Sequence, residues 1–595
     1  MGCATPALEH LSGTLERVTF HNEENGFCVL KVKVKGQRDL VTVVGEAPFV
    51  VPGEYVDCFG QWVHDRTHGL QFRARELRMV PPDTLEGIEK YLGSGLIRGI
   101  GPHFAKKLVE AFGEGVFDVI EGSPDDLLAL PGIGEKRKAR VVEAWAEQKE
   151  VRRIMVFLHS HGVGTARAVR IYKTYGEKAI ELITQNPYRL ALDIHGIGFK
   201  TADALARRLG VEGDSPFRVQ AGVRHVLQAF AEEGHCMVPQ ESVIEETVAL
   251  LDVSRACVEG AIQESLRKGE LKAVSSDGIP SLFLPPLYFA EEGVARHLKR
   301  LLEGPLPWPA IDPALAIPWV EKRTGLALSD SQKRAIATAL KSKVMVITGG
   351  PGVGKTTLVN SLLTILRAKG AEVQLAAPTG RAAKRLSESA GLPAKTLHRL
   401  LEYDPSLGDF RRRREHPLEG DLVVVDEASM VDVVLMNQLL RALPDSAALL
   451  LVGDVDQLPS VGPGSVLADI IASRAVPTVH LTEVFRQAAQ SQIIQNAHRI
   501  HQGKLPARDI GEKRDFFFIA AETPEDIQDK LLQVVCERIP KGFGLHPVRD
   551  VQVLTPMQRG GLGSRTLNSL LVERLNPQGS PRIRRFGMSF APGDK

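Results

Sequence analysis

The stretch VMVITGGPGVGKTT, residues 344–357, joins a short apolar run to a glycine-rich turn. Leu358, Leu362 and Leu366 then continue it at helical spacing. A strand, a glycine turn and a helix in this order are the context that a phosphate-binding loop of the form GxxxxGK[ST] requires. The stretch therefore predicts a nucleotide site at the end of a buried strand.

Each part of this loop has a chemical role. Its glycines let backbone N–H groups close around a phosphate, and the helix N-terminus adds a positive dipole. Lys355 neutralises the β and γ oxygens, and Thr356 offers a ligand to Mg²⁺, so ATP with Mg²⁺ is the expected cofactor pair. A purely structural glycine turn is the alternative, which the flanking strand and helix disfavour. The predicted nucleotide-binding residues here are Gly349, Gly350, Pro351, Gly352, Val353, Gly354, Lys355, Thr356 and Thr357.

Later segments end in polar residues suited to phosphate hydrolysis. The apolar run 422–425 closes on Asp426, suited to hold Mg²⁺ with Thr356, and on Glu427, suited to polarise the attacking water. The run 448–452 leads into GDVDQLPSV, where Gln457 is suited to sense the γ-phosphate and Asp454 or its neighbours to touch DNA. Arg486, in LTEVFRQ, is suited to reach the γ-phosphate from a second lobe. The predicted catalytic residues are Lys355, Asp426, Glu427, Gln457 and Arg486.

Gln332 lies just ahead of the phosphate loop. Its amide can both donate and accept toward adenine N6 and N7, so it is a further candidate for nucleotide binding. Capping of a helix N-terminus, together with Ser329 or Asp330, is the plainer interpretation, and the two are compatible.

Length and composition leave the partner open. The chain has 595 residues, enough for three or four domains, and a net charge of only +2, so any nucleic-acid binding must come from local patches. The sequence has no apolar run of membrane-spanning length and no signal-like start, which predicts a cytoplasmic protein without a membrane partner. Its six cysteines form no CxxC pair, so neither a zinc site nor a disulfide framework is indicated.

The N-terminal region divides into three patterns. Residues 1–82 hold five short β-prone segments, which predict a small barrel of the oligonucleotide-binding kind. Its aromatic residues either stack on bases or, as we favour, fill the barrel core; they are Phe27, Phe59, Trp62 and Phe72. Residues 215–303 read as three helices and a β-hairpin, the order of a winged-helix module, and the proline-rich residues 304–324 as a linker.

Residues 83–214 contain a repeat. A glycine-hydrophobic-glycine element recurs at intervals of 33, 30 and 34 residues, and it resembles tandem helix-hairpin-helix elements. In that motif the glycines allow a tight turn and leave backbone N–H groups exposed to a DNA phosphate. A helical scaffold without DNA contact is the alternative. The four elements begin at Gly99, Gly132, Gly162 and Gly196.

The motif series GGPGVGKT, LAAPTGRAAKRL, TLHRLL, VVVDEASM, LLLVGDVDQLPSVGPGSVL, LTEVFRQ and VLTPMQRGGLGSRTLN resembles the RecD-like branch of superfamily 1 DNA helicases, in the long stand-alone form. The resemblance implies a multidomain α/β protein with a RecA-like ATPase lobe at 325–475, a hairpin wedge at about 400–421, and a partial second lobe at 476–595. It also implies 5′ to 3′ movement on single-stranded DNA or on tailed duplex DNA. A monomer would suffice for this movement. The implied DNA-contacting residues are Thr379, Arg381, His398, Asp454, Thr555, Pro556 and Gln558.

The family pattern continues with an SH3-like insertion and two further motifs, and the present sequence reaches Lys595 about where that insertion begins. The first expectation is therefore an ATP-dependent DNA helicase with DNA-stimulated ATP hydrolysis. The alternative is a DNA-binding or structure-recognition protein whose ATPase does not unwind. A conjugative relaxase-helicase is disfavoured, because Tyr55 and Tyr91 lack a neighbouring histidine cluster.

Overall fold

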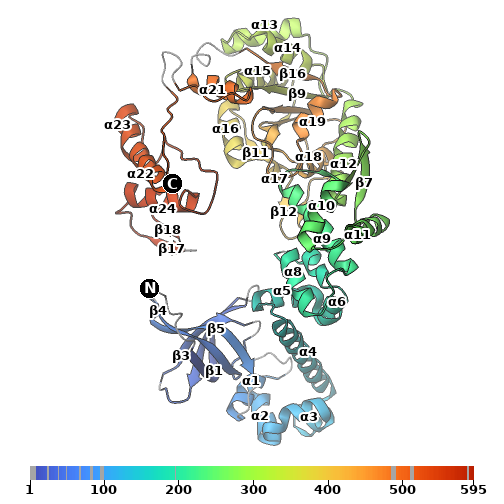
Figure 1. Cartoon of the computed structure of the whole chain (residues 1–595), viewed down its shortest axis with the longest axis vertical. Helices are drawn as coiled ribbons and strands as arrows, with labels where there is room; N and C mark the ends of the chain where they lie inside the picture. Colours follow the sequence, from blue (N-terminus) through green and yellow to red (C-terminus); the bar gives the residue numbers. More distant parts are fainter. Residues whose placement is uncertain are drawn as a thin grey trace.

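The computed structural model describes residues 9–22, 26–37, 39–47, 50–65, 69–80, 85–93, 100–194, 196–483, 491–508, 515–585 and 588–594. They form a barrel, a helical region, a small α/β module, a parallel-sheet lobe and a C-terminal part, in chain order (Figure 1). This confirms the predicted multidomain α/β fold. No helix within these ranges is long and apolar enough to cross a membrane.

The N-terminal barrel is closed, with strand order β1-β2-β3-β5-β4. Phe72 is fully buried and meets Trp62 edge to face at 5.3 Å, whereas Phe27 and Phe59 are each 39% exposed. The prediction that all four aromatics fill the core therefore holds for Phe72 but not for Phe27 and Phe59. The strands are β1 (Glu9–His21), β2 (Phe27–Val34), β3 (Val41–Glu46), β4 (Tyr55–Asp65) and β5 (Gly69–Val80).

The helical region confirms the glycine repeat as turns between helices. Gly132, Gly162 and Gly196 have φ of 97°, 76° and 83°, a region that favours glycine. The second glycine of an element caps the next helix, as Gly164 and Gly198 do. Gly99 lies outside the described residues. The helices are α1 (Leu85–Gly93), α2 (Pro102–Phe112), α3 (Val116–Gly122), α4 (Glu135–Ser160), α5 (Thr165–Tyr175), α6 (Ala179–Gln185), α7 (Leu190–Asp193) and α8 (Phe199–Arg208).

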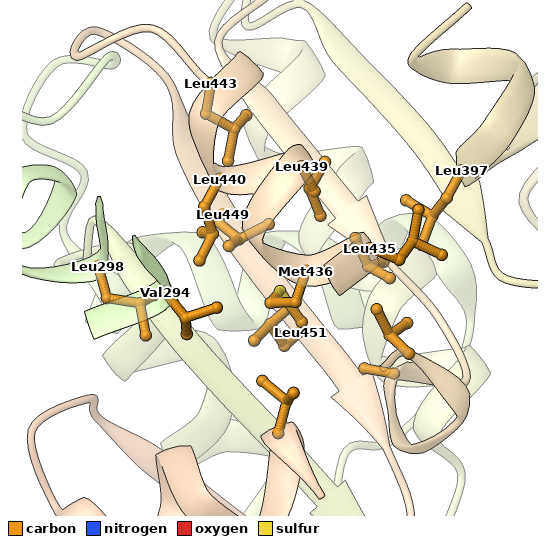
Figure 2. Packing of buried hydrophobic residues seen from close by; sticks show 14 of the residues in the cluster. Val294, Leu298, Leu397, Leu435, Met436, Leu439, Leu440, Leu443, Leu449 and Leu451 are labelled. Carbon is orange, nitrogen blue, oxygen red and sulfur yellow. The ribbon is translucent and has the colours of Figure 1, made fainter. Parts of the chain in front are cut away.

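The next module has the predicted winged-helix order, and its sheet is β6-β8-β7. Its last helix packs on the motor lobe: Val294 and Leu298 belong to the same buried cluster as Leu439, Leu440 and Leu443, which Figure 2 shows from close by. The two domains therefore share a core. The elements are α9 (Pro216–Glu232), β6 (Met237–Pro239), α10 (Gln240–Leu251), α11 (Arg255–Arg267), β7 (Lys272–Ser276), β8 (Ile279–Phe283) and α12 (Pro285–Leu302).

The predicted linker 304–324 is mostly part of the motor lobe. Its second half is α13 (Pro313–Thr324), which Asp312 caps and which tolerates Pro318 in its interior. Val320 is fully buried, and the Trp308 indole N–H donates to Leu340 O at 3.0 Å. The linker interpretation was wrong here because proline content masked an apolar helical face.

The motor lobe is a six-stranded parallel sheet of order β11-β10-β14-β15-β9-β16, covered on both faces. Alternate residues of β9 pack into the hydrophobic cores on opposite faces of the sheet. Val344 and Val346 lie in one core, and Met345 and Ile347 lie in the other. Its strands are β9 (Val344–Gly349), β10 (Val373–Ala377), β11 (Ala394–Thr396), β14 (Leu422–Val425), β15 (Ala448–Gly453) and β16 (Thr478–Leu481). Its helices are α14 (Asp330–Ala339), α15 (Lys355–Ala368), α16 (Gly380–Ala390), α17 (Leu397–Leu400), α18 (Val433–Ala442) and α19 (Val466–Ser473).

Strand β16 corrects the predicted boundary between the lobes. It pairs with β9, so the first lobe's sheet extends to Leu481 and does not end at residue 475. Beyond it lie α21 (Gln492–His501), α22 (Pro524–Gln533), α23 (Ile539–Phe543) and α24 (Ser564–Leu575), with the antiparallel pair β17 (Ile583–Arg585) and β18 (Met588–Phe590). The predicted wedge is a short hairpin of β12 (Tyr403–Asp404) and β13 (Asp409–Phe410).

Candidate nucleotide and DNA site

The phosphate loop joins β9 to α15, as its sequence predicts. Gly352 and Gly354 have φ of 80° and 75°, so a side chain at either position would be strained. Gly349 is required for a different reason: a Cβ there would lie 2.8 Å from Leu481 O of β16. The loop therefore takes its shape from two left-handed glycines and from the close approach of the edge strand.

Lys355 begins α15 and points back across the loop. Its ammonium group donates to the carbonyl oxygens of Gly349 and Gly350, the latter at 3.2 Å, and lies 3.9 Å from Asp454 Oδ2. A lysine held at the mouth of a glycine loop by weak carbonyl acceptors has its charge directed where a phosphate would sit. This geometry suits the predicted role of Lys355.

Gln332 is fully buried, and both polar ends of its amide are used within the protein. Its Oε1 accepts from the Ser329 N–H at 3.0 Å, completing a capping box at the start of α14. Its Nε2 donates to the carbonyls of Val353 and Gly354 at 3.4 and 3.3 Å. The capping prediction is confirmed, and the adenine contact stays a prediction.

The two acids stand at the carboxyl end of β14, two strands from β9. Burial raises the pKa of Asp426 and of Glu427; the Asp426 charge raises the second further, while Lys355 lowers both. Strands β14, β15 and β9 are parallel neighbours, so the acids and the phosphate loop lie at one edge of the sheet. Glu427 has φ of 52°, and its N–H donates to Asp426 Oδ1 at 3.0 Å.

Oxygen atoms at this edge fit a hydrated Mg²⁺ ion. Within the described ranges, Thr348 Oγ1, Glu427 Oε2 and Ser429 Oγ are buried without a hydrogen-bond partner. Buried polar atoms are normally satisfied, and hard divalent cations with their waters prefer oxygen donors of this kind. Thr356, on the exposed start of α15, adds a hydroxyl. The donor set therefore suits the predicted cofactor pair.

Asp454 corrects the sequence analysis. It is 2% exposed, faces Lys355, and accepts from Gln457 Nε2 at 3.2 Å, so its carboxylate cannot present itself to a DNA strand. The exposed tip of the same loop lies four to seven residues later, where Leu458 is 86% and Val461 is 91% exposed. The neighbours of Asp454 are thus the part of this loop available to DNA.

Among the other predicted DNA contacts, Arg381 is exposed in the first turn of α16, whereas Thr379 and Thr555 are half-buried. Thr379 caps α16 by accepting from Ala382 N, and Arg381 Nη2 donates to Gln552 at 3.5 Å, which links the lobe to the C-terminal part. Pro556 and Gln558 are exposed, and the Thr555 hydroxyl donates to Leu562 O at 2.6 Å. Arg486 falls outside the described residues, so its predicted role stays a prediction.

His398 stands at the base of the hairpin with two aromatic neighbours that the sequence analysis missed. Its ring lies 5.6 Å from Phe410 and 6.0 Å from Tyr403, and those two rings are 5.2 Å apart. The pairing of β12 with β13 brings them together, so only the hairpin register could have revealed the cluster. The rings meet edge-on or tilted, so they do not stack on one another, and an aromatic cluster of this kind suits contacts with unpaired bases.

The arginine run of the hairpin is largely neutralised. Arg411 pairs with Asp404 at 2.6 Å, Arg412 with Glu402 at 2.9 Å, and Arg413 with Glu415 at 3.3 Å. The suggestion that four arginines hold phosphates at a fork is therefore weakened for three of them.

Two further residues at the nucleotide site were also missed. Glu483, just after β16, accepts from the Ser331 hydroxyl and from its backbone N–H, and so ties the turn after β16 to α14. His498 of α21 lies over Gly350 of the phosphate loop. Glu483 lies within LTEVFRQ, whose predicted site residue is Arg486, and His498 lies outside the motif series. Both contacts join segments more than 140 residues apart in sequence, so local patterns do not reveal them.

Four stretches of the chain match known protein families. Residues 327–521 match an AAA domain, and residues 147–237 match the HHH domain of the ATP-dependent RecD2 DNA helicase. Residues 8–82 match the OB-fold domain of the ATP-dependent DNA helicase YrrC, and residues 94–147 a SAM-like helix-hairpin-helix tandem.

Similar proteins include a RecD2 helicase and RecD subunits of the RecBCD enzyme. The ATP-dependent RecD2 DNA helicase of Deinococcus radiodurans is 33% identical over 611 residues, which cover 100% of this chain and 82% of that protein. The RecBCD enzyme subunit RecD of Mycolicibacterium smegmatis is 39% identical over 35% of this chain and 41% of that subunit. The corresponding subunit of Mycobacterium tuberculosis is 41% identical over 32% of this chain and 36% of that subunit.

Proposed function

This chain belongs to the family of ATP-dependent RecD2 DNA helicases, and we propose that it moves 5′ to 3′ along single-stranded DNA with ATP hydrolysis that DNA stimulates. The enzyme class, an ATP-dependent DNA helicase, follows from the family. The direction of movement and the stimulation of ATP hydrolysis by DNA go beyond family membership. The RecD-like order of the motifs along the chain supports both.

One observation carries the proposal. Lys355, Asp426, Glu427 and Asp454 come from three segments and meet at the carboxyl edge of one parallel sheet. Ligands of open α/β sheets bind at this edge. Phosphoryl transfer needs a loop that binds the phosphates and a carboxylate that orients the attacking water and accepts its proton. The arrangement supplies both.

The chain's own residues divide the work. Loop N–H groups and Lys355 hold the phosphates, and Glu427 orients the attacking water and receives its proton, a task that its raised pKa favours. Asp426 and Thr356 would hold Mg²⁺, which supplies charge neutralisation for the transferring phosphoryl group. Gln457 is hydrogen-bonded to Asp454 and precedes the exposed tip of the same loop. Loss of the terminal phosphate would therefore change the position of Gln457 and, with it, of the loop tip.

Strand separation on tailed duplexes tests the proposal. The purified chain, with ATP and Mg²⁺, is mixed with duplexes that carry a 5′ tail, a 3′ tail or no tail, and Lys355→Ala serves as the control. The expected result is separation of the 5′-tailed duplex alone, and none by the variant. Unwinding from a 3′ tail would contradict the polarity, and binding without separation would favour the DNA-recognition alternative.

A further inference from the structure

Helix α21 places a histidine over the phosphate loop. A methyl group built on Gly350 would lie 3.2 Å from His498 Cε1 and 3.9 Å from His498 Nε2, so the imidazole edge faces the loop. The carbonyl of the same glycine accepts from Lys355 at 3.2 Å. An imidazole ring and an ammonium group from different helices therefore both lie next to Gly350. Because the loop lysine serves the β and γ phosphates, this is the terminal-phosphate side of the loop.

The position of α21 is fixed by contacts of its own. Its N-cap Ser491 donates to Asp515 at 2.6 Å, and Asn496 exchanges two hydrogen bonds with the backbone of Ala507, at 3.0 and 2.7 Å. Gln492 and Asn496 are only 2% and 3% exposed. These contacts anchor the helix to the segment that follows it, at Ala507 and Asp515.

The same face of α21 also touches the second nucleotide loop. His501 Nδ1 lies 3.3 Å from Asp456 Oδ1, two residues past Asp454. Side chains three apart on a helix share a face, so His498 and His501 together bridge the loop after β9 and the loop after β15.

We propose that His498 is a nucleotide-contacting residue, whose ring N–H donates to the terminal phosphate of ATP. The proposal rests on the proposed function, since it needs ATP at this loop. It gives α21, and through it the C-terminal part, a contact present with a triphosphate and absent with a diphosphate. A ring that merely packs on the glycine would show no such preference.

Affinity measurements distinguish the two roles. Calorimetry on the full chain, with Mg²⁺ and without DNA, gives the dissociation constants of ATPγS and ADP. His498→Ala is expected to weaken ATPγS binding about tenfold, as loss of one charge-assisted hydrogen bond does, and ADP binding less than threefold. His498→Gln, which keeps an N–H donor at similar reach, is expected to recover most of the loss. Ile493→Ala, at a 55% exposed position of the same helix, is the matched control and is expected to bind like wild type.

Three outcomes would overturn the proposal: unchanged ATPγS affinity in both His498 variants, equal losses for ADP and ATPγS, or an equal loss in Ile493→Ala. Lys355→Ala separates this failure from failure of the proposed function. If Lys355→Ala binds ATPγS normally, the nucleotide site itself is misplaced. If it does not bind while the His498 variants do, only the assignment of His498 fails.

Discussion

The ammonium nitrogen of Lys355 lies 3.9 Å from Asp454 Oδ2, so the phosphate loop and the end of β15 meet in an ion pair. The carboxylate is 2% exposed and also accepts from the backbone N–H of Asp456 at 3.1 Å. Strands β9 and β15 are parallel neighbours, which brings their carboxyl ends together. Asp454 therefore lies among the predicted nucleotide-binding residues and not on the predicted DNA path.

Asp454→Ala is expected to impair catalysis and to spare DNA binding. Removing a buried partner of Lys355 leaves that charge uncompensated, so kcat for ATP hydrolysis should fall at least about tenfold. Affinity for single-stranded DNA without nucleotide, measured by fluorescence anisotropy, should stay within about twofold of wild type. Leu458→Ala, at the exposed tip of the same loop, is expected to show the reverse pattern. If Asp454→Ala lost DNA affinity and kept its kcat, Asp454 would instead be a DNA-contacting residue.

Leu301→Ala is expected to destabilise the motor lobe although it lies in the preceding module. Leu301 is fully buried in the core that α12 shares with α18. Truncating such a leucine costs about 3 kcal/mol of unfolding free energy. Scanning calorimetry should show the motor-lobe transition at lower temperature, whereas Leu315→Ala, at a 74% exposed position, should leave it in place. Equal shifts in both variants would rule out a shared core.

His297 is expected to make the stability of the chain depend on pH. Burial and nearby arginines lower the pKa of His297 to about 4, below its usual 6.5. Between these values the unfolded chain binds more protons, so stability is present above pH 6.5 and is lost as the pH falls toward 4. Because solvent screens the partly exposed ring, the expected loss from pH 7 to pH 5 is about 1 kcal/mol.

Thermal unfolding at pH 7 and pH 5 measures this loss. His297→Gln should narrow the wild-type difference in melting temperature, while His416→Gln, at an exposed position, should leave it unchanged. A wild-type difference that persists in His297→Gln would show that other groups cause it.

The tip of the hairpin is expected to matter for strand separation alone. Leu407 is 73% exposed between β12 and β13, and the Tyr403 and Phe410 rings brace the arms 5.2 Å apart. If the hairpin splits the duplex, Leu407→Gly should slow unwinding of a 5′-tailed duplex at least about fivefold. DNA-stimulated ATP hydrolysis should stay within about twofold, because the residue touches no nucleotide-site group. Parallel losses in both assays would contradict a wedge.

Local patterns predicted the features that depend on neighbouring residues. The phosphate loop, the five barrel strands and the left-handed turn glycines are each set by a few consecutive positions, because φ preference and alternation are local properties. The acidic pair at the end of β14 followed in the same way, since parallel strands deliver their carboxyl ends to one edge.

Features that depend on distant partners escaped the sequence. An apolar face on α12 predicts burial but not that α18 covers it, and the four residues of β16 do not reveal that β9 is their partner. Asp454 was misplaced because its burial depends on Lys355 and on the fold of its own loop. His498 was missed because nothing near it in sequence resembles a nucleotide site.

The rate of ATP hydrolysis with and without single-stranded DNA tests the central claim most directly. The account predicts that DNA raises the wild-type rate at least about tenfold and that Lys355→Ala lowers the stimulated rate at least about a hundredfold while the chain remains folded by circular dichroism. A Lys355→Ala variant that hydrolyses ATP at the wild-type rate would contradict it.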